Sequence, residues 1–188
     1  MAIDLGMHVD NWRHQDQTYK VPCEFAKKNG MKYVELGTVN GDYFVHSLGY
    51  NPHIALHSDP LRLKAYFDAM GLKVSQIDAA YPVSGPDGQY RGVPYTIEAI
   101  KYARAIGAPY VDTTDGATKP VGYTDDEVLV LIKQYYRVCL EWAESHDIVL
   151  NIEPHGPYTT NPDFLEKIFT VVNSPRLRMN FDTGNVFI

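Results

Sequence analysis

The chain lacks most features that mark secreted, membrane-spanning or nucleotide-binding proteins. Only two of its 188 residues are cysteine, Cys23 and Cys139, so neither a disulfide framework nor a thiolate metal site is expected. No window holds the roughly eighteen uninterrupted apolar residues of a membrane span, and the N-terminal MAIDLGMHVDN lacks the basic segment of a signal peptide. No Gly-x-Gly-x-x-Gly or Gly-Lys-Ser/Thr loop follows the first predicted strand, which argues against a dinucleotide or P-loop site. We therefore predict a cytoplasmic location.

Positive charge is also scarce. Seventeen basic residues stand against 23 acidic residues, which gives a formal net charge of -6. The basic residues are scattered instead of clustered into a stripe that could follow a phosphate backbone, so nucleic acid is not an expected partner. With 45% hydrophobic residues, the chain can bury a sizeable core, and one domain over residues 1–188 is the expectation.

Short apolar runs alternate with longer amphipathic segments along the chain, which predicts strands alternating with helices. Gly30, Gly71 and Gly107 each precede a predicted strand, where the end of a helix favours a left-handed residue. Thr124 and Glu127 form a capping-box pattern at the start of another helix. The predicted strands are Ile3 to His8, Lys32 to Leu36, Leu72 to Asp78, Pro109 to Thr113, Ile148 to Glu153 and Leu177 to Asp182. Repeated strand and helix units build a parallel sheet.

The polar residues of the last two predicted strands favour a closed barrel over an open, doubly wound sheet. Alternation places Asn151 and Glu153 on one face of their strand, and Asn180 and Asp182 on one face of the next. A doubly wound sheet needs apolar side chains on both faces, whereas a barrel can hold polar side chains inside its catalytic mouth. We therefore predict an α/β fold of the (β/α)₈ TIM-barrel type.

The number of strands predicts that this barrel is incomplete at its C-terminal end. About six βα units are present where closure needs eight, and 188 residues fall short of the roughly 250 that are typical. An open sheet would expose its edges and inner face, so we expect the last two βα units to come from the intact protein or from another chain. A homo-oligomer is expected, with a separate partner subunit as the alternative.

Polar residues end nearly every predicted strand, and barrel active sites lie at those carboxyl ends. Glu153 and Asp182 are the sharpest pair, because adjacent parallel strands lie about 4.8 Å apart and two carboxylates that close repel one another unless protonated or bridged by a cation. The alternative is that each carboxylate caps the loop that follows it. The other strand-end candidates are His8, Glu35, Asp78, Asp112, His155 and Asn185.

Two motifs in this part of the chain resemble a known superfamily. Asn151-Ile-Glu-Pro-His155, followed by Asn180-Phe-Asp-Thr-Gly-Asn185, is similar to the strand-five and strand-six motifs of the xylose-isomerase-like enzymes, which include ketose 3-epimerases, inosose dehydratases and hydroxypyruvate isomerases. The resemblance implies one divalent cation, Mn²⁺ first, with Mg²⁺ or Co²⁺ as alternatives, bound by Glu, Asp, His and Glu. Glu153 and Asp182 match the first two ligands, and the other two are expected beyond Ile188.

The resemblance also implies a function, a sugar isomerase or epimerase. Such an enzyme removes a proton next to a carbonyl and forms a metal-stabilised enediolate, with Glu153 as both ligand and proton carrier. Many epimerases have a substrate-binding histidine where this chain has Asn185, and His155 could supply the missing imidazole. His8, Glu35 and Asp112 could contact the carbohydrate, or could serve structural roles.

This departure at Asn185 keeps other functions open. One alternative is a metal-dependent lyase or dehydratase acting on inosose or a 3-oxo-glycoside, including cleavage of a C- or O-glycoside with a partner subunit. Another is a noncatalytic barrel fragment. An abasic-site endonuclease conflicts with the charge balance. His46, His53 and His57 lack the spacing of paired helical zinc ligands, so no second metal site is expected from them.

Overall fold

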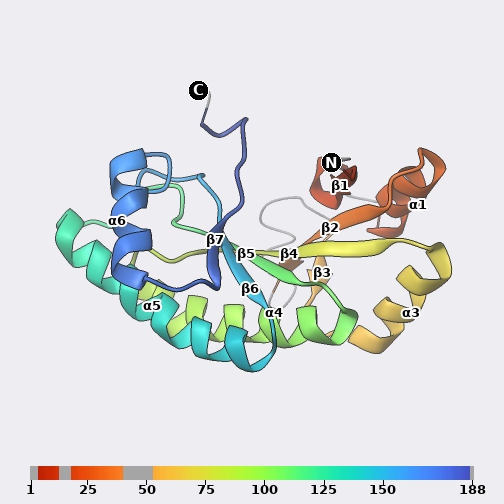
Figure 1. The fold of residues 1–188 in the computed structure, drawn as a ribbon, viewed down its shortest axis with the longest axis horizontal. Helices are drawn as coiled ribbons and strands as arrows, with labels where there is room; N and C mark the ends of the chain where they lie inside the picture. The colour runs from red at the N-terminus through yellow and green to blue at the C-terminus, as the bar shows by residue number, and fades with distance from the viewer. Residues whose placement is uncertain (1–3, 13–17, 40–52, 187–188) are drawn as a thin grey trace. The chain divides into compact units, whose positions relative to one another are not determined.

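Strands and helices alternate along the chain, and the strand pairs whose register is defined are all parallel (Figure 1). The computed structural model describes residues 4–12, 18–39 and 53–186. The chain divides into two units, the first comprising residues 1–78 and 101–110, and the second comprising residues 79–100 and 111–188. None of the described helices has the length and apolar content needed to cross a membrane.

The first unit is built around β2 (Tyr33–Val39). The strand β1 (Gly6–His8) pairs with one side of β2, and the first part of β4 (Lys73–Pro82) pairs with the other side, while the short β3 (Ile54–Ala55) also pairs with β2. The register places His8 opposite Glu35, and Gly37 opposite Asp78. Neighbouring strands therefore carry neighbouring polar side chains, with His8 at the end of β1 and with Glu35 and Asp78 inside β2 and β4.

Local sequence explains the helices of the first unit. The helix α3 (Pro60–Met70) begins after Asp59, whose side chain accepts hydrogen bonds from the backbone N–H groups of Leu61 and Arg62. It ends at Gly71, whose φ of 69° is the left-handed conformation that glycine adopts without strain. The unit also contains α1 (Lys20–Lys28), the 3₁₀ turn η1 (Val9–Asn11) and the end of α4 (Val93–Ile106).

The second unit contains the end of β4, all but the first residue of β5 (Tyr110–Thr114), and then β6 (Val149–Ile152) and β7 (Leu177–Met179). Its helical segments are the turn η2 (Gly88–Gly92), the beginning of α4, α5 (Asp125–Ser145) and α6 (Pro162–Val172). The predicted capping box at Thr124 and Glu127 starts α5, and the buried face of this helix includes Tyr135, Tyr136 and Cys139.

The prediction that the last strand reaches Asp182 is wrong, because β7 ends at Met179. One further backbone hydrogen bond, from Asn180 N to Ile152 O at 3.1 Å, extends the pairing with β6, and the chain then enters a turn. Met179 and Phe181, which alternate with Asn180 and Asp182, are 43% and 60% exposed. Alternation of residue types therefore continues beyond the hydrogen-bonded strand.

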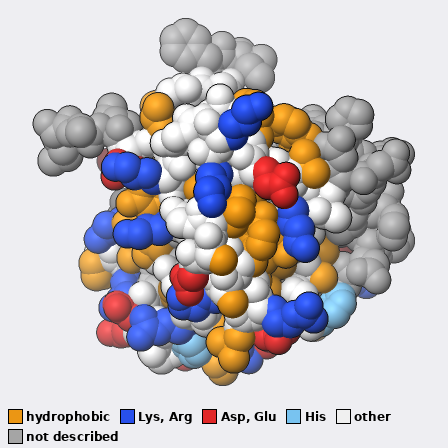
Figure 2. Space-filling view, turned by 90° about the vertical axis from the view of Figure 1, so that its right-hand side faces the viewer, with side chains coloured by type: hydrophobic (Ala, Val, Ile, Leu, Met, Phe, Trp, Pro, Cys, Tyr) orange, Lys and Arg blue, Asp and Glu red, His pale blue; other side chains and the backbone are white. Residues whose placement is uncertain are grey.

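Basic side chains are dispersed on the molecular face drawn in Figure 2. Lys and Arg side chains lie there among acidic and hydrophobic ones instead of forming one continuous stripe. This distribution agrees with the scatter of basic residues along the sequence.

Candidate functional site

The first unit gathers an imidazole and several carboxylates on or directly after its neighbouring strands. His8 is the last residue of β1, and its Nε2 lies 3.5 Å from Glu35 Oε1 and 3.6 Å from Asp78 Oδ2. Asp78, opposite Gly37, is held by a hydrogen bond from Thr38 Oγ1 to its carbonyl oxygen at 2.8 Å. The structure therefore places the predicted substrate-contacting residues His8 and Glu35 close to one another, with Asp78 beside them.

Asp10 and His53 extend this group, and sequence reasoning missed both contributions. The backbone N of Asp10 donates to His8 Nδ1 at 3.0 Å, and Asp10 Oδ2 lies 3.0 Å from Nε2 of the buried His53. We call His8, Asp10, Glu35, His53 and Asp78 the His8 cluster. His53 was considered in the sequence only with His46 and His57, and His46 lies outside the described residues.

Burial and the charges of the His8 cluster shift the pKa of the imidazole in opposite directions. Burial lowers the pKa of His8, but the hydrogen bond to Asp78 and the negative charges of Glu35, Asp10 and Asp78 outweigh burial and raise the pKa to about 9. The N–H of Asp10, which points at Nδ1, favours the neutral ring with its proton on Nε2. In either state Nε2 carries a proton that faces the Glu35 and Asp78 carboxylates.

In the second unit, Glu153 follows β6 and accepts two side-chain hydrogen bonds. Asn185 Nδ2 donates to Glu153 Oε1 at 2.8 Å, and Asn180 Nδ2 donates to Glu153 Oε2 at 3.3 Å. The backbone N of Glu153 donates to Thr113 O at 2.9 Å, which ties this residue to β5. Neutral amide donors therefore orient both carboxylate oxygens of Glu153.

Asp182 lies in the turn after β7, where it accepts backbone hydrogen bonds from Gly184 N at 2.6 Å and from Asn185 N at 3.3 Å. Both bonds reach Oδ1, and within residues 53–186 no hydrogen bond reaches Oδ2. Asp182 therefore caps the turn in which it lies, as the structural alternative predicted. Asn185 contacts both predicted metal ligands, Glu153 through its side chain and Asp182 through its backbone, so the two carboxylates belong to one neighbourhood.

The loop after β6, which carries His155, is held by a residue that sequence reasoning missed. Asp115 is fully buried, and its Oδ2 accepts from Tyr158 N at 2.8 Å and from Thr159 N at 3.3 Å. Its Oδ1 accepts from Gly156 N at 2.9 Å and from Thr159 Oγ1 at 2.7 Å. The available signal was an aspartate followed by glycine, two residues after the end of a predicted strand.

The remaining predicted site residues differ in position. His155 is exposed, and its backbone N donates to Thr159 Oγ1 at 2.9 Å. Asp112 is 1% exposed and is the third residue of β5, inside the strand and not at its end. The proposed substrate contacts of both residues stay predictions.

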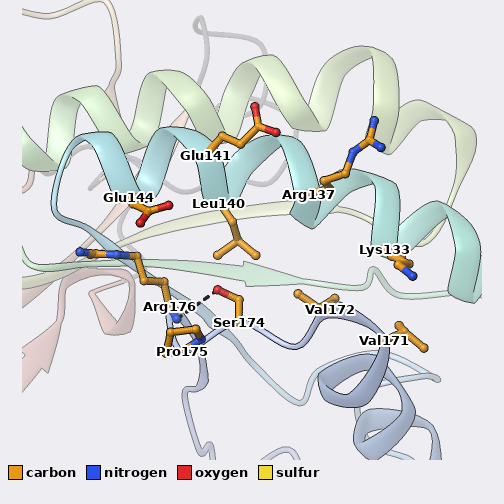
Figure 3. Close-up of a pocket in the computed structure, with 10 residues that line it drawn as sticks. All are labelled: Lys133, Arg137, Leu140, Glu141, Glu144, Val171, Val172, Ser174, Pro175 and Arg176. Atoms are coloured by element: carbon orange, nitrogen blue, oxygen red, sulfur yellow. Dashed lines mark hydrogen bonds between the residues drawn. The ribbon is translucent and has the colours of Figure 1, made fainter.

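A separate cleft of about 310 Å³ lies between α5 and α6 of the second unit (Figure 3). Arg176, at its border, donates to Ile148 O at 3.1 Å and to Asp147 Oδ1 at 3.3 Å. Asp147 and Ile148 directly precede β6, and Arg176 directly precedes β7, so the cleft lies at the amino ends of these strands. Catalytic groups of parallel α/β barrels lie at the opposite, carboxyl ends. We therefore assign this cleft no part in the candidate active site.

Comparison with known proteins gives one family match and many structural matches. The family model described as xylose isomerase-like TIM barrel matches residues 23–188. No curated protein sequence matches the chain.

Three of the similar solved structures illustrate the likeness. The probable 3-DHS dehydratase AsbF of Bacillus anthracis has a TM-score of 0.74 and 16% identity, covering 98% of this chain and 65% of its own. The IolI protein, solved with a zinc atom, has a TM-score of 0.75 and 15% identity, covering 98% and 64%. An L-ribulose 3-epimerase has a TM-score of 0.69 and 15% identity, covering 98% and 62%. The chain therefore spans less than two thirds of the length of each of these structures.

Proposed function

The chain belongs to the xylose isomerase-like TIM-barrel family, and from this premise we propose that it forms part of a divalent-metal-dependent sugar isomerase or epimerase. The family match confirms the predicted α/β fold class. The observation that carries the proposal is Asn185, which contacts Glu153 through its side chain and Asp182 through its backbone. Two carboxylates in one neighbourhood at the carboxyl ends of adjacent strands suit a divalent cation and proton transfer.

The donor set in the second unit fits such a cation. Glu153 and Asp182 provide carboxylate oxygens, which Mn²⁺ and Mg²⁺ favour, and Oδ2 of Asp182 accepts no hydrogen bond within the described residues. The zinc atom in the IolI structure supports metal binding in this fold, and Mn²⁺ is the cation that we propose here. When bound, the cation supplies positive charge that offsets the negative charge developing on a substrate oxygen.

Side chains of the second unit would then carry out proton transfer and substrate binding. Glu153 is oriented by Asn180 and Asn185 and can remove a proton from the carbon next to a carbonyl group. Asn185 can also donate to a sugar hydroxyl, although an amide cannot transfer a proton at neutral pH. His155 has an ionisable ring in an exposed position and is our candidate for the second proton carrier.

The test measures solvent exchange and metal content together. The protein is loaded with Mn²⁺, its metal content is measured, and a panel of keto-sugars is incubated with it in deuterated water. We expect deuterium at the carbon next to the carbonyl. Glu153→Gln should reduce the exchange rate by about 10²- to 10⁴-fold, because it removes the proton acceptor.

The matched control is Glu141→Gln, which removes an exposed carboxylate from α5 in the same unit and should leave exchange unchanged. If the metal-loaded protein exchanges no proton of any keto-sugar, or if Glu153→Gln exchanges as fast as the unchanged protein, the proposal is wrong.

A metal-dependent lyase or dehydratase is the second candidate, because Asn185 stands where many epimerases have a histidine, and because AsbF is a probable dehydratase. Elimination next to a carbonyl also begins with proton removal, so Glu153 keeps its role. Product analysis separates the two reactions. Loss of water or of an aglycone without an epimer would identify the lyase.

We also propose that further βα units cover the edge of the second unit. An apolar groove of about 750 Å³ is lined by Leu165, Phe169, Met179, Phe181 and Val186, among others. Met179, Phe181 and Val186 are 43%, 60% and 39% exposed, and an apolar surface beside an edge strand favours association. A noncatalytic fragment would instead bind a partner at this edge, show no stoichiometric metal and exchange no substrate proton.

A further inference from the structure

We propose that the His8 cluster binds a divalent cation of its own, of the Zn²⁺ class, through His8, Asp10 and Asp78. This site uses neither Glu153 nor Asp182, and it is built entirely within the first unit. It also differs from the histidine group rejected as a metal site in the sequence, because only His53 is shared and it would not be a ligand.

The ligand atoms already lie close together. One atom each from His8, Asp10 and Asp78 can be chosen so that all three lie within 4.8 Å of one another. Two ligands that share a Zn²⁺ ion at about 2.1 Å each lie about 3.4 Å apart at a tetrahedral angle. Asp10 Oδ1 is 3.8 Å from His8 Nδ1, so a small side-chain movement would bring these two ligands to one ion. Asp78, whose Oδ2 lies 3.6 Å from His8 Nε2, would turn from that nitrogen toward the ion.

Asp10 supplies the independent observation that points to a ligand. Its Oδ1 atom is buried and has no hydrogen-bond partner within the described residues, which is costly for a carboxylate oxygen. Its other oxygen is fixed by His53, whose side chain is only 6% exposed. His53 therefore orients Asp10 and leaves the lone pairs of Oδ1 directed toward His8 and available to a cation.

Gly37 provides the room for this arrangement. A Cβ atom at this position would lie 2.6 Å from Asp10 Oδ1 and 2.5 Å from His53 Cδ2. Real Cβ atoms do not approach other atoms so closely, so any larger residue would displace the Asp10 and His53 pair. The backbone of β2 therefore lets the carboxylate approach the strand end.

The protonation of His8 suits ligation through Nδ1. Because Nδ1 accepts the N–H of Asp10, it has a lone pair, and a cation that takes this lone pair displaces only that one hydrogen bond. The Nε2–H group faces Glu35 Oε1, which itself accepts from Gln76 Nε2 at 2.7 Å. A metal-bound histidine whose second nitrogen donates to a carboxylate is a common arrangement in metalloproteins.

Charge balance also favours a cation. Asp10, Glu35 and Asp78 surround one imidazole, and their side chains are only 18% to 19% exposed. Even with His8 protonated, Asp10 and Asp78 together leave one negative charge. Within the part of the chain that the structure describes, neither Asp10 nor Asp78 forms an ion pair with lysine or arginine. A divalent cation would neutralise this excess.

Zinc titration tests the proposal in a variant that removes the other candidate site, Glu153→Gln with Asp182→Asn. We expect this double variant to bind one equivalent of Zn²⁺ by calorimetry. Adding Asp10→Asn or Asp78→Asn should weaken Zn²⁺ binding by about 100-fold or more, since each removes a charged ligand. Adding Asp4→Asn, which removes an exposed carboxylate paired with Lys32, is the control and should change nothing.

A second measurement guards against loss of folding in those variants. In the Glu153→Gln, Asp182→Asn protein, one equivalent of Zn²⁺ should shift the ring nitrogen resonances of His8 in NMR spectra. No zinc binding in the double variant, unshifted His8 resonances, or unchanged affinity in a folded Asp10→Asn protein would each overturn the proposal. Because the test excludes Glu153 and Asp182, failure here leaves the proposed enzymatic function untouched.

Discussion

The two units hold their carboxylates in opposite ways. In the first unit, Glu35 and Asp78 face one imidazole, and Asp10 keeps a buried oxygen without a hydrogen-bond partner among the described residues. In the second unit, Glu153 accepts two amide N–H groups, and Asp115 accepts four hydrogen bonds. The difference teaches that the carboxylates of the His8 cluster face an imidazole, whereas Glu153 and Asp115 accept hydrogen bonds from neutral donors.

The largest expected effect comes from Asp115, the most completely hydrogen-bonded carboxylate of the second unit. Asp115→Asn replaces one accepting oxygen by an N–H donor that faces backbone N–H groups. We expect the free energy of unfolding to fall by about 3 kcal/mol, measured by urea denaturation. Asp163→Asn, an exposed change in the first turn of α6, should cost less than about 0.5 kcal/mol. Equal losses in the two variants would remove the contrast between the units.

The next prediction tests whether His8 is protonated in the folded first unit. Because the folded state raises the pKa of His8 from 6.5 to about 9, His8 stabilises the metal-free protein fully below pH 6.5, and this stabilisation disappears as the pH rises through 9. His8→Gln should therefore lower the free energy of unfolding by up to about 3 kcal/mol more at pH 6 than at pH 10. A loss independent of pH would mean that the N–H of Asp10 keeps the ring neutral.

The smallest effects separate the two amides on Glu153. Asn185 donates at 2.8 Å and Asn180 at 3.3 Å, so the first hydrogen bond should be stronger. Asn185→Ala should lower the free energy of unfolding by about 1 kcal/mol, and Asn180→Ala by about half of that, as measured in urea. The reverse order would show that Asn180 is the main donor to Glu153.

Much of the fold could be predicted from the sequence, because strands, caps and glycine stops are local signals. Thr124 and Glu127 start α5 as predicted, and Gly71 ends α3. The end of β7 could not be predicted, since polar and apolar residues continue to alternate from Asn180 to Asp182 after the pairing with β6 stops. Strand ends depend on partner strands, which lie far away in the sequence.

The candidate sites were predicted less completely, for the same reason. Strand-end position identified His8 and Glu153, and also Glu35, although β2 continues past Glu35 to Val39. The partners of Asp10 and Asp115 are about 40 residues away in the chain. His53 was judged by its spacing from other histidines, whereas its partner is Asp10. A buried carboxylate that holds a distant loop has no short motif, so only the fold reveals it.

The hold of Asp115 on the loop after β6 has a consequence for how chemistry could change in this fold. Asp115 accepts hydrogen bonds from the backbone N–H groups of Gly156, Tyr158 and Thr159. His155, which precedes these residues, is exposed. The loop conformation therefore does not depend on which side chain occupies position 155. The side chain at position 155 could be an imidazole, an amide or a hydroxyl while the loop backbone keeps its conformation, so new reactivity would not require a new loop.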